Sequence, residues 1–114
     1  MLDISYEIRK GILFIRLDGI LTKITFKKLK KEITDMIEDN GISNVVFNIE
    51  RLSSIDDFGI NCLKENIKIC KNNDGKALLC GLNNDIKNLI LKSNIFDQTT
   101  FIDSELNAFQ EIIV

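Results

Sequence analysis

The chain has 114 residues, with 15 basic and 17 acidic side chains, a formal charge of −2, three cysteines and no histidine. A chain of this length buries one core, so we expect a single domain spanning residues 1–114. The nearly balanced charge gives no electrostatic reason to expect nucleic acid or an anionic membrane as a partner.

The residue types also limit the chemistry. The three cysteines lack the spacing of metal ligands, and without histidine we expect no metal site, no disulfide framework and no cofactor. The usual general base is missing, so we predict that the protein is not an enzyme. Residues 1–5 do not resemble a signal peptide, and no run approaches the roughly 20 apolar residues of a membrane span. We therefore expect a cytoplasmic protein that does not insert into the membrane.

The first half of the chain predicts two strands, a helix and a third strand. The strands Ile4–Arg9 and Ile12–Leu17 are joined by a turn at residues 10–11 and form a β-hairpin. After a second turn at Asp18-Gly19, a helix is predicted from about Thr25 to Asp39, where Asn40-Gly41 stops it. A buried strand follows over residues 44–49. The apolar stripe of this helix consists of Phe26, Leu29, Ile33, Met36 and Ile37.

The second half continues the alternation of helices and strands. We predict a helix from the Asp56-Asp57 turn to about Asn72, a strand over residues 76–80, a helix, a short strand over residues 99–102 and a last helix capped by Asp103 or Ser104. The order ββαβαβαβα predicts an α/β fold, with a mixed, mostly parallel sheet and an antiparallel hairpin at its edge. The residues predicted to face inward on the last two helices are Ile86, Leu89, Ile90, Leu106, Phe109 and Ile113. No glycine-rich phosphate loop follows any of the strands.

The stretch Ser54 to Ile60 joins a strand to a helix that begins with two carboxylates. Asp56 as the N-cap and Asp57 in the first turn are a common way to start a helix, with a stabilisation of roughly 1 kcal/mol. The same helix start carries unpaired N–H groups that favour anions and phosphoryl groups. Adjacent carboxylates do not converge on one substrate atom, so a glycosidase-like pair is not expected.

This helix has two apolar faces. At about 100° per residue, one stripe consists of Ile60, Leu63, Ile67 and Cys70, whereas Phe58, Cys62 and Ile69 cluster on roughly the opposite side. Either a neighbouring helix covers this second stripe, or the stripe is a partner surface. The lysines crowded at the start of the preceding helix are interpreted as a solvated face with helpful charge pairs.

The element order and the stretch Asn48 to Ile60 resemble the STAS domain, the fold of bacterial anti-sigma-factor antagonists. The family typically has an apolar residue, Asp, Ser, Ser or Ala, Gly and Leu at this helix start, and Ile55, Asp56, Gly59 and Ile60 match that pattern. Residues 18–22 resemble an earlier turn of the family. The resemblance also implies that the start of the preceding helix lies on the same side as the motif, so its lysines would alternatively face Asp56 and Asp57 or an acidic partner. In the family the first serine of the motif is phosphorylated by a partner kinase that is also an anti-sigma factor, and phosphorylation breaks the complex.

The matching position is occupied by Asp57, and the second small residue is replaced by Phe58. Asp57 cannot accept the phosphate and carries about one negative charge, compared with roughly −1.5 to −2 for phosphoserine. We therefore predict no phosphorylation here, with Ser53 and Ser54 on the preceding loop as the alternative sites. Asp57 is interpreted as an imperfect, permanent mimic of the phosphorylated state. The module would then either be unable to form the usual kinase complex or bind a partner that tolerates the charge.

The resemblance implies an interaction module of a partner-switching system that binds an anti-sigma factor or a serine-kinase-like protein. Asp56 would hold the helix start, Asp57 would set the charge, Phe58 would be an apolar anchor and Gly59 would permit close approach. The remaining predicted partner-binding residues are Asp18, Thr22 and Cys62. A homodimer is left open. The alternatives are a STAS subunit associated with a membrane-transporter ATPase and, without positive support, a sensor of a small ligand.

Overall fold

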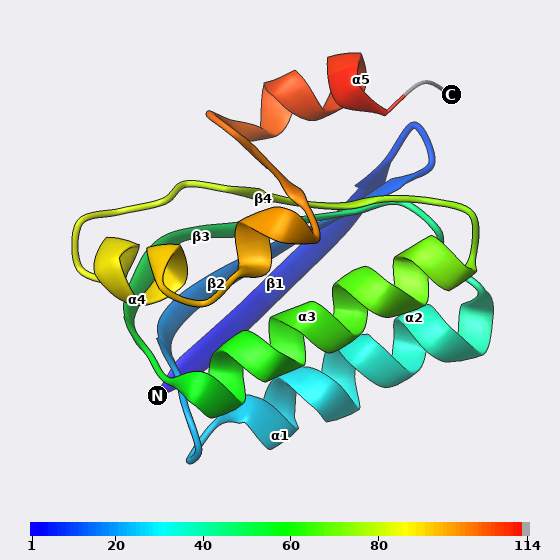
Figure 1. Ribbon diagram of the computed structural model, residues 1–114. Helices are drawn as coiled ribbons and strands as arrows, with labels where there is room; N and C mark the ends of the chain where they lie inside the picture. Colours follow the sequence, from blue (N-terminus) through cyan, green and yellow to red (C-terminus); the bar gives the residue numbers. More distant parts are fainter. Residues whose placement is uncertain (113–114) are drawn as a thin grey trace.

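The computed structural model describes residues 1–112, in which five strands form one sheet in the order β1-β2-β3-β4-β5 (Figure 1). β1 (Leu2–Arg9) and β2 (Ile12–Leu21) are antiparallel. β3 (Val45–Ile55), β4 (Ala77–Cys80) and β5 (Thr100–Ile102) continue the sheet in parallel. This topology confirms the predicted α/β fold class with a mostly parallel sheet and an N-terminal antiparallel hairpin.

The hairpin turn was predicted correctly, but β2 is longer than expected. Lys10 and Gly11 both have positive φ, at 51° and 80°, as the tight two-residue turns of hairpins require. β2 continues through Asp18-Gly19 to Leu21, so the predicted turn at these residues is wrong. The reason is tertiary: Gly19 pairs with Leu2 of β1 and Leu21 pairs with Ile55 of β3, which keeps this segment extended.

The first helix comprises α1 (Phe26–Leu29), a π-helical segment over Lys30–Thr34 and α2 (Asp35–Asn40), and ends at Gly41 with φ 61° as predicted. Leu29, Ile33 and Ile37 are fully buried. Residues four apart drift by about 40° around an α-helix, since each residue turns it by about 100°. The wider π segment offsets this drift and keeps these side chains on the sheet.

β3 also runs further than predicted, from Val45 to Ile55 instead of stopping at Ile49. Ser53 and Ser54 therefore belong to the strand and not to a loop, because Ser54 pairs with Ile20 of the lengthened β2. α3 (Asp57–Asn72) follows directly. Its core stripe was predicted correctly, since Ile60, Leu63, Ile67 and Cys70 are all buried.

The C-terminal part contains α4 (Lys87–Leu91), the 3-10 turns η2 (Ile95–Asp97) and η3 (Glu105–Asn107), and α5 (Ala108–Glu111). Ser104 forms the predicted cap, with Asn107 completing a capping box. Leu89 and Leu106 were predicted to face inward but are 46% and 70% exposed, because both helices are too short to bury a full stripe. The predicted inward residue Ile113 lies outside the described residues.

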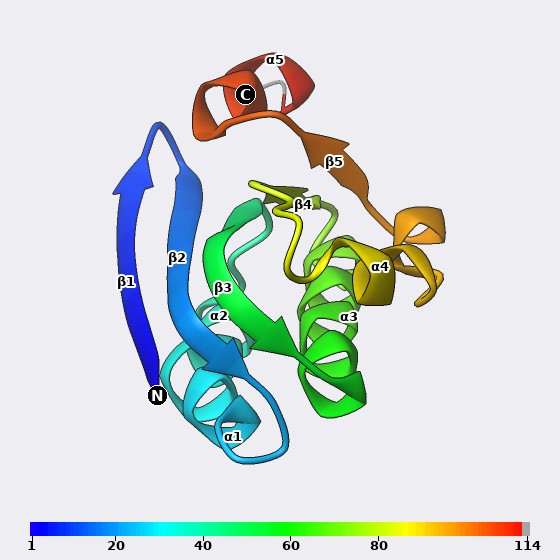
Figure 2. The same ribbon diagram turned by 90° about the vertical axis from the view of Figure 1, so that its left-hand side faces the viewer.

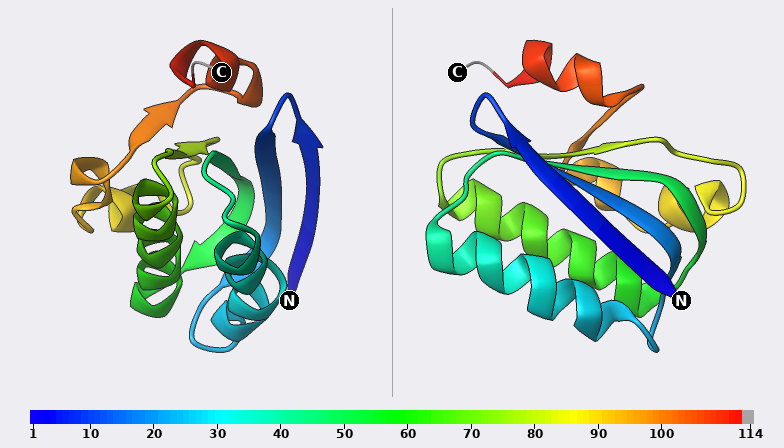
Figure 3. Two further views of the ribbon diagram at one scale, coloured as in Figure 1. Left: turned by 90° about the vertical axis from the view of Figure 1, so that its right-hand side faces the viewer. Right: turned by 180° about the vertical axis from the view of Figure 1, so that it is seen from behind.

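The helices cover the two faces of the sheet unequally. α1 to α4 pack on one face over the main core, whereas η3 and α5 cover only part of the other (Figures 1 and 3). On this second face, Phe109 of α5 lies against Phe14 of β2, with ring centroids 5.6 Å apart. No helix within residues 1–112 is long and apolar enough to cross a membrane.

Ionic contacts hold η3 on the sheet. Glu105 accepts from Nε and Nη2 of Arg16 at 2.8 and 2.7 Å, and from Asn48 Nδ2 at 3.0 Å. Arg9 lies 3.7 Å from the same carboxylate. The hydrogen bonds that Arg16 donates lower the pKa of Glu105 below its ordinary value. The pKa of Arg16 is raised, because Arg16 donates to both Glu105 and Glu7. Arg16 and Glu105 are therefore both charged at neutral pH.

Candidate partner-binding site

The first part of the site is the loop between β2 and α1, which forms a compact turn. Thr22 O accepts from the backbone N of Thr25 and Phe26 at 3.0 and 2.8 Å, and Thr25 Oγ1 accepts from Thr22 N at 3.0 Å. Thr25 Oγ1 also donates to Ile20 O at 2.7 Å. Thr22, a predicted partner-binding residue, is half-buried and shapes the loop through its backbone and through Oγ1, which accepts from Ile24 N at 3.3 Å.

Asp56 connects this loop to the start of α3. One carboxylate oxygen accepts from Gly59 N at 3.0 Å, which is the N-cap bond, and the other accepts from Lys23 N at 2.8 Å. The backbone N of Asp56 also donates to Leu21 O at 3.4 Å. Both carboxylate oxygens are occupied within the protein, so the predicted role of Asp56 in holding the helix start agrees with its geometry.

Gly59 allows this close packing. It is buried in the first turn of α3, and a Cβ at this position would collide with Leu21 O of β2. The constraint is steric, because the backbone of Gly59 is helical and needs no special φ. The predicted close approach at Gly59 is therefore an approach of β2 within the domain.

Asp57 and Phe58 point outward from the same turn. The Asp57 carboxylate is exposed and has no hydrogen-bond partner within residues 1–112. Phe58 is 47% exposed, with its ring 5.5 Å from that of Phe26 and 6.0 Å from Lys23 Nζ. An isolated carboxylate next to a half-exposed aromatic ring suits a surface that meets another protein.

The residue that the sequence reasoning missed is Ile24. It lies on the loop tied to Asp56 and is 74% exposed. Thr22, on the same loop, belongs to the family motif. The exposure of Ile24 results from the turn of the loop, and no periodic pattern in the sequence indicates it. Ile24, Asp57 and Phe58 are from here on called the motif surface.

Cys62 is less available than predicted. It is 6% exposed, and its Sγ lies 3.9 Å from Phe26 O on α1. Burial raises the pKa of its thiol to about 11. The neighbouring helix thus covers this part of the second apolar stripe, which is the first of the two alternatives for that stripe. Phe58 is the part that stays accessible, above a shallow groove of about 150 Å³ that it shares with Phe26 and Cys62.

The lysines at the start of the first helix do not neutralise the motif aspartates. Lys23 contacts Asp56 through its backbone N, and Lys28 donates from Nζ to Leu2 O at 2.6 Å. Their arrangement agrees with the interpretation as a largely solvated face.

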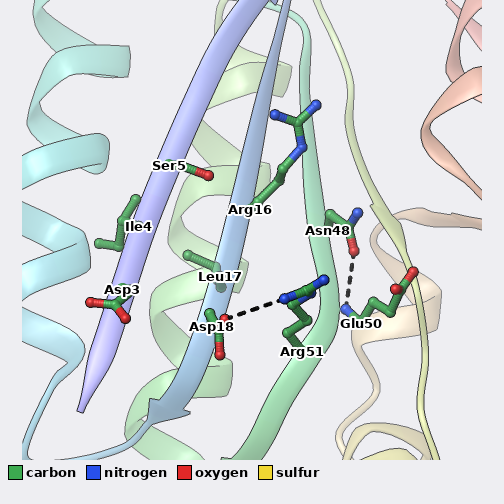
Figure 4. A pocket seen from close by; sticks show the side chains of 9 residues that line it. All are labelled: Asp3, Ile4, Ser5, Arg16, Leu17, Asp18, Asn48, Glu50 and Arg51. Atoms are coloured by element: carbon green, nitrogen blue, oxygen red, sulfur yellow. Dashed lines mark hydrogen bonds and ion pairs between the residues drawn. The ribbon is translucent and has the colours of Figure 1, made fainter.

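Asp18 lies apart from the motif surface, on the open face of the sheet (Figure 4). It is 3.9 Å from Arg51 and lines a hollow of about 320 Å³ together with Asp3, Ser5 and Arg16. The structure does not bring Asp18 together with Asp57, because Asp18 stands on the β2 strand and not on a turn. Ser53 donates to Gly19 O at 3.1 Å near the end of β3.

The STAS domain family model matches residues 3–108 of this chain. A curated relative, the anti-sigma F factor antagonist of Paenibacillus polymyxa, is 25% identical over 113 residues, which cover 99% of this chain and 97% of the relative. The sequence similarity therefore extends over almost the whole of both proteins.

Solved structures show the same fold. An anti-sigma factor antagonist from Mycobacterium paratuberculosis superposes with a TM-score of 0.87 at 11% identity, covering 98% of this chain and 94% of that one. The Bacillus cell fate determinant SpoIIAA in its phosphorylated form superposes with a TM-score of 0.73 at 18% identity, covering 96% and 98%. With the family match over most of its length, this chain belongs to the STAS domain family.

Proposed function

We propose that this STAS domain is the antagonist of a bacterial partner-switching pair, and that it binds an anti-sigma factor or a serine-kinase-like protein through the motif surface. One comparison supports this role: the curated relative is named an anti-sigma F factor antagonist, and its similarity covers nearly the full length of both chains. The name belongs to the relative, so the argument for this chain rests on its own surface.

The observation that carries the proposal is the contrast between Asp56 and Asp57. Both carboxylate oxygens of Asp56 accept from backbone N–H groups. Within residues 1–112, the carboxylate of its neighbour Asp57 has no hydrogen-bond partner and is exposed next to Phe58 in the sequence. The start of α3 needs only the N-cap bond of Asp56. It explains neither the exposed carboxylate of Asp57 nor the exposed ring of Phe58. An exposed carboxylate and two exposed apolar side chains, Ile24 and Phe58, on a firmly bonded loop and helix start form a suitable centre for a protein interface.

We further propose that Asp57 occupies the position that is a phosphorylated serine in other members, so the switch is fixed. A carboxylate has two acceptor oxygens and about one charge, whereas a phosphoserine has three oxygens and roughly −1.5 to −2 charges. Asp57 therefore imitates the phosphorylated state only in part. A kinase that binds the unphosphorylated antagonist would be repelled, or would need a surface that accepts this charge.

The test is binding to the anti-sigma kinases of the same genome, measured by calorimetry for the wild type, Asp57→Ser and Asp57→Ala. If Asp57 mimics the phosphorylated state, wild type binds weakly, both variants bind at least about tenfold more tightly, and only Asp57→Ser accepts phosphate from ATP. Asp39→Ser is the matched control, because Asp39 is exposed at the end of α2 and away from the motif.

Two results would count against parts of the proposal. Tight binding by the wild type that weakens in Asp57→Ala would show that the partner uses the charge, and would remove the mimic interpretation. Absence of binding for every variant would overturn the anti-sigma role. Co-purification with membrane ATPase subunits would then favour the transporter-associated alternative.

A further inference from the structure

The two edges of the sheet differ strongly. β5 closes one edge with only three residues, whereas β1 forms the other with eight (Figure 2). β1 pairs with β2 without a bulge over its whole length, and the chain contains no proline. Proteins usually block long edge strands with bulges, prolines or inward charges, because an open edge can pair with another chain. β1 has neither a bulge nor a proline, and its charged residues Asp3, Glu7 and Arg9 alternate with the residues whose backbone groups face outward.

The hairpin determines which backbone groups of β1 face outward. Arg9 and Ile12 flank a two-residue turn and therefore exchange both of their hydrogen bonds. Pairs alternate along the hairpin, and the bond from Ile20 N to Met1 O at 2.8 Å follows the same alternation. The odd-numbered residues of β1 thus bond to β2, and the even-numbered residues direct their N–H and C=O outward.

One of these outward groups is already satisfied. Lys28 Nζ donates to the carbonyl of Leu2, at the beginning of the strand. Within residues 1–112, the outward backbone groups of Ile4, Tyr6 and Ile8 have no hydrogen-bond partner. Tyr6 and Ile8 are 53% and 65% exposed, so the accessible part of the edge also carries exposed apolar side chains.

The sequence of β1 is complementary to itself in one antiparallel register. With Tyr6 opposite Tyr6 of a second copy, Ile4 faces Ile8 and Asp3 faces Arg9, each pair occurring twice. The Arg9 side chain also lies 3.7 Å from Glu105 of its own copy and is 38% exposed. The hydrogen-bonded pairs in this register are those of Ile4, Tyr6 and Ile8, the residues with free outward groups. Shifting by two residues in either direction places Asp3 opposite Glu7, or Glu7 opposite itself, which is unfavourable.

We propose that two copies of this chain form a symmetric dimer in which the β1 strands pair antiparallel around Tyr6. The two five-stranded sheets join into one continuous sheet, and Tyr6 and Ile8 of both copies pack on its helix-bearing side. An identical surface on both copies is what a two-fold interface requires. The inference does not depend on the proposed function, because β1 contributes nothing to the motif surface.

Mass measured by light scattering and sedimentation over a range of concentrations tests the dimer. At about 100 µM we expect a particle of twice 13.0 kDa, or 26 kDa. Asp3→Arg places two arginines opposite each other and should raise the dimer dissociation constant at least about tenfold. Tyr6→Pro removes an outward N–H without removing a bond to β2, and should also give a monomer. Ile24→Lys is the control: it alters the motif surface and should stay dimeric.

A cysteine cross-link tests the register. Cα atoms of a hydrogen-bonded antiparallel pair are about 5.5 Å apart, within disulfide range. Tyr6→Cys should therefore oxidise to a covalent dimer, whereas Ile8→Cys, which faces Ile4, should not. The three native cysteines are buried and do not interfere.

Three results would overturn the proposal: a wild-type monomer at all concentrations, a dimer unaffected by Asp3→Arg, or equal cross-linking of the two cysteine variants. Loss of the dimer with unchanged partner binding would leave the proposed function standing. Loss of partner binding in Ile24→Lys with an intact dimer would support both the proposed function and the separate dimer interface.

Discussion

At the scale of single residues, two adjacent aspartates do different work. Asp56 faces inward to the backbone of a loop and of a helix, while Asp57 faces solvent. The sequence predicted the N-cap from residue type and position, because that bond is local. It could not predict the second bond, to Lys23, since that bond joins residues 33 positions apart.

This difference predicts unequal effects on stability. Asp56→Ala removes two backbone hydrogen-bond acceptors and should lower the free energy of unfolding by about 2 kcal/mol. Asp57→Ala removes an exposed side chain and should change it by less than about 0.5 kcal/mol. Urea denaturation of both variants measures this. Equal losses would mean that Asp57 is structural, which would weaken its assignment to the motif surface.

Gly59 gives a second prediction at this scale. In the interior of a helix, glycine to alanine usually stabilises by about 1 kcal/mol. Here the added Cβ meets Leu21 O, so Gly59→Ala should destabilise the protein by about 2 kcal/mol or more. Asn61→Ala, at an exposed position of the same helix, is the control. A Gly59→Ala protein as stable as the wild type would show that β2 and α3 can separate without cost.

At the scale of elements, the sequence predicted types better than lengths. Apolar patterns identified β2 and β3, but both strands run past their apolar runs because they pair with each other to Leu21 and Ile55. The π segment in the first helix was not predicted, since it results from packing Leu29, Ile33 and Ile37 on one sheet. The helical pattern wrongly placed Leu89 and Leu106 on the buried side, because the C-terminal helices are too short to bury a full stripe.

The attachment of η3 to the sheet predicts an acid-dependent loss of stability. The pKa of Glu105 is lowered in the folded state, so its contribution is complete above the ordinary carboxyl pKa and is lost as pH falls through the folded pKa. Glu105→Gln should cost about 1–2 kcal/mol at pH 7. The difference from wild type should shrink below about pH 4.5.

Urea unfolding at a series of pH values measures this difference. The control is Glu111→Gln, an exposed acid of α5. A constant gap between wild type and Glu105→Gln from pH 7 down to about pH 3 would show that the carboxylate charge is not what holds η3.

At the scale of the whole molecule, the three buried thiols predict a loss of stability in alkali. Burial raises the pKa of Cys70 and Cys80 to about 12 and that of Cys62 to about 11. Above about pH 9 the unfolded chain ionises its thiols while the folded chain keeps the protons, so the free energy of unfolding falls as pH rises.

Unfolding measured from pH 7 to about pH 10 should show this decline, and the triple cysteine-to-alanine variant should show a flatter one. Native thiols should react slowly with a disulfide reagent at pH 8, and rapidly after unfolding. Fast labelling of Cys62 in the native protein would mean that α1 separates from α3.

The overall architecture was predictable because each strand and helix carries its own apolar pattern, and alternating elements have few allowed arrangements. The family motif then singled out Asp57 and Phe58, and the structure places both at the exposed start of α3. What the motif could not supply was Ile24, whose exposure is set by a turn of the loop, or the position of Asp18, which depends on how far β2 extends.

The two hydrogen bonds that the Asp56 carboxylate accepts have a consequence for the affinity of the proposed interface. They hold the loop bearing Ile24 in place before any partner arrives, so little conformational freedom is left to lose on binding. A loosened loop would reduce affinity without changing any residue at the interface. In the proposed interface, Asp56 would therefore affect affinity without contacting the partner, by keeping the loop that bears Ile24 in one conformation.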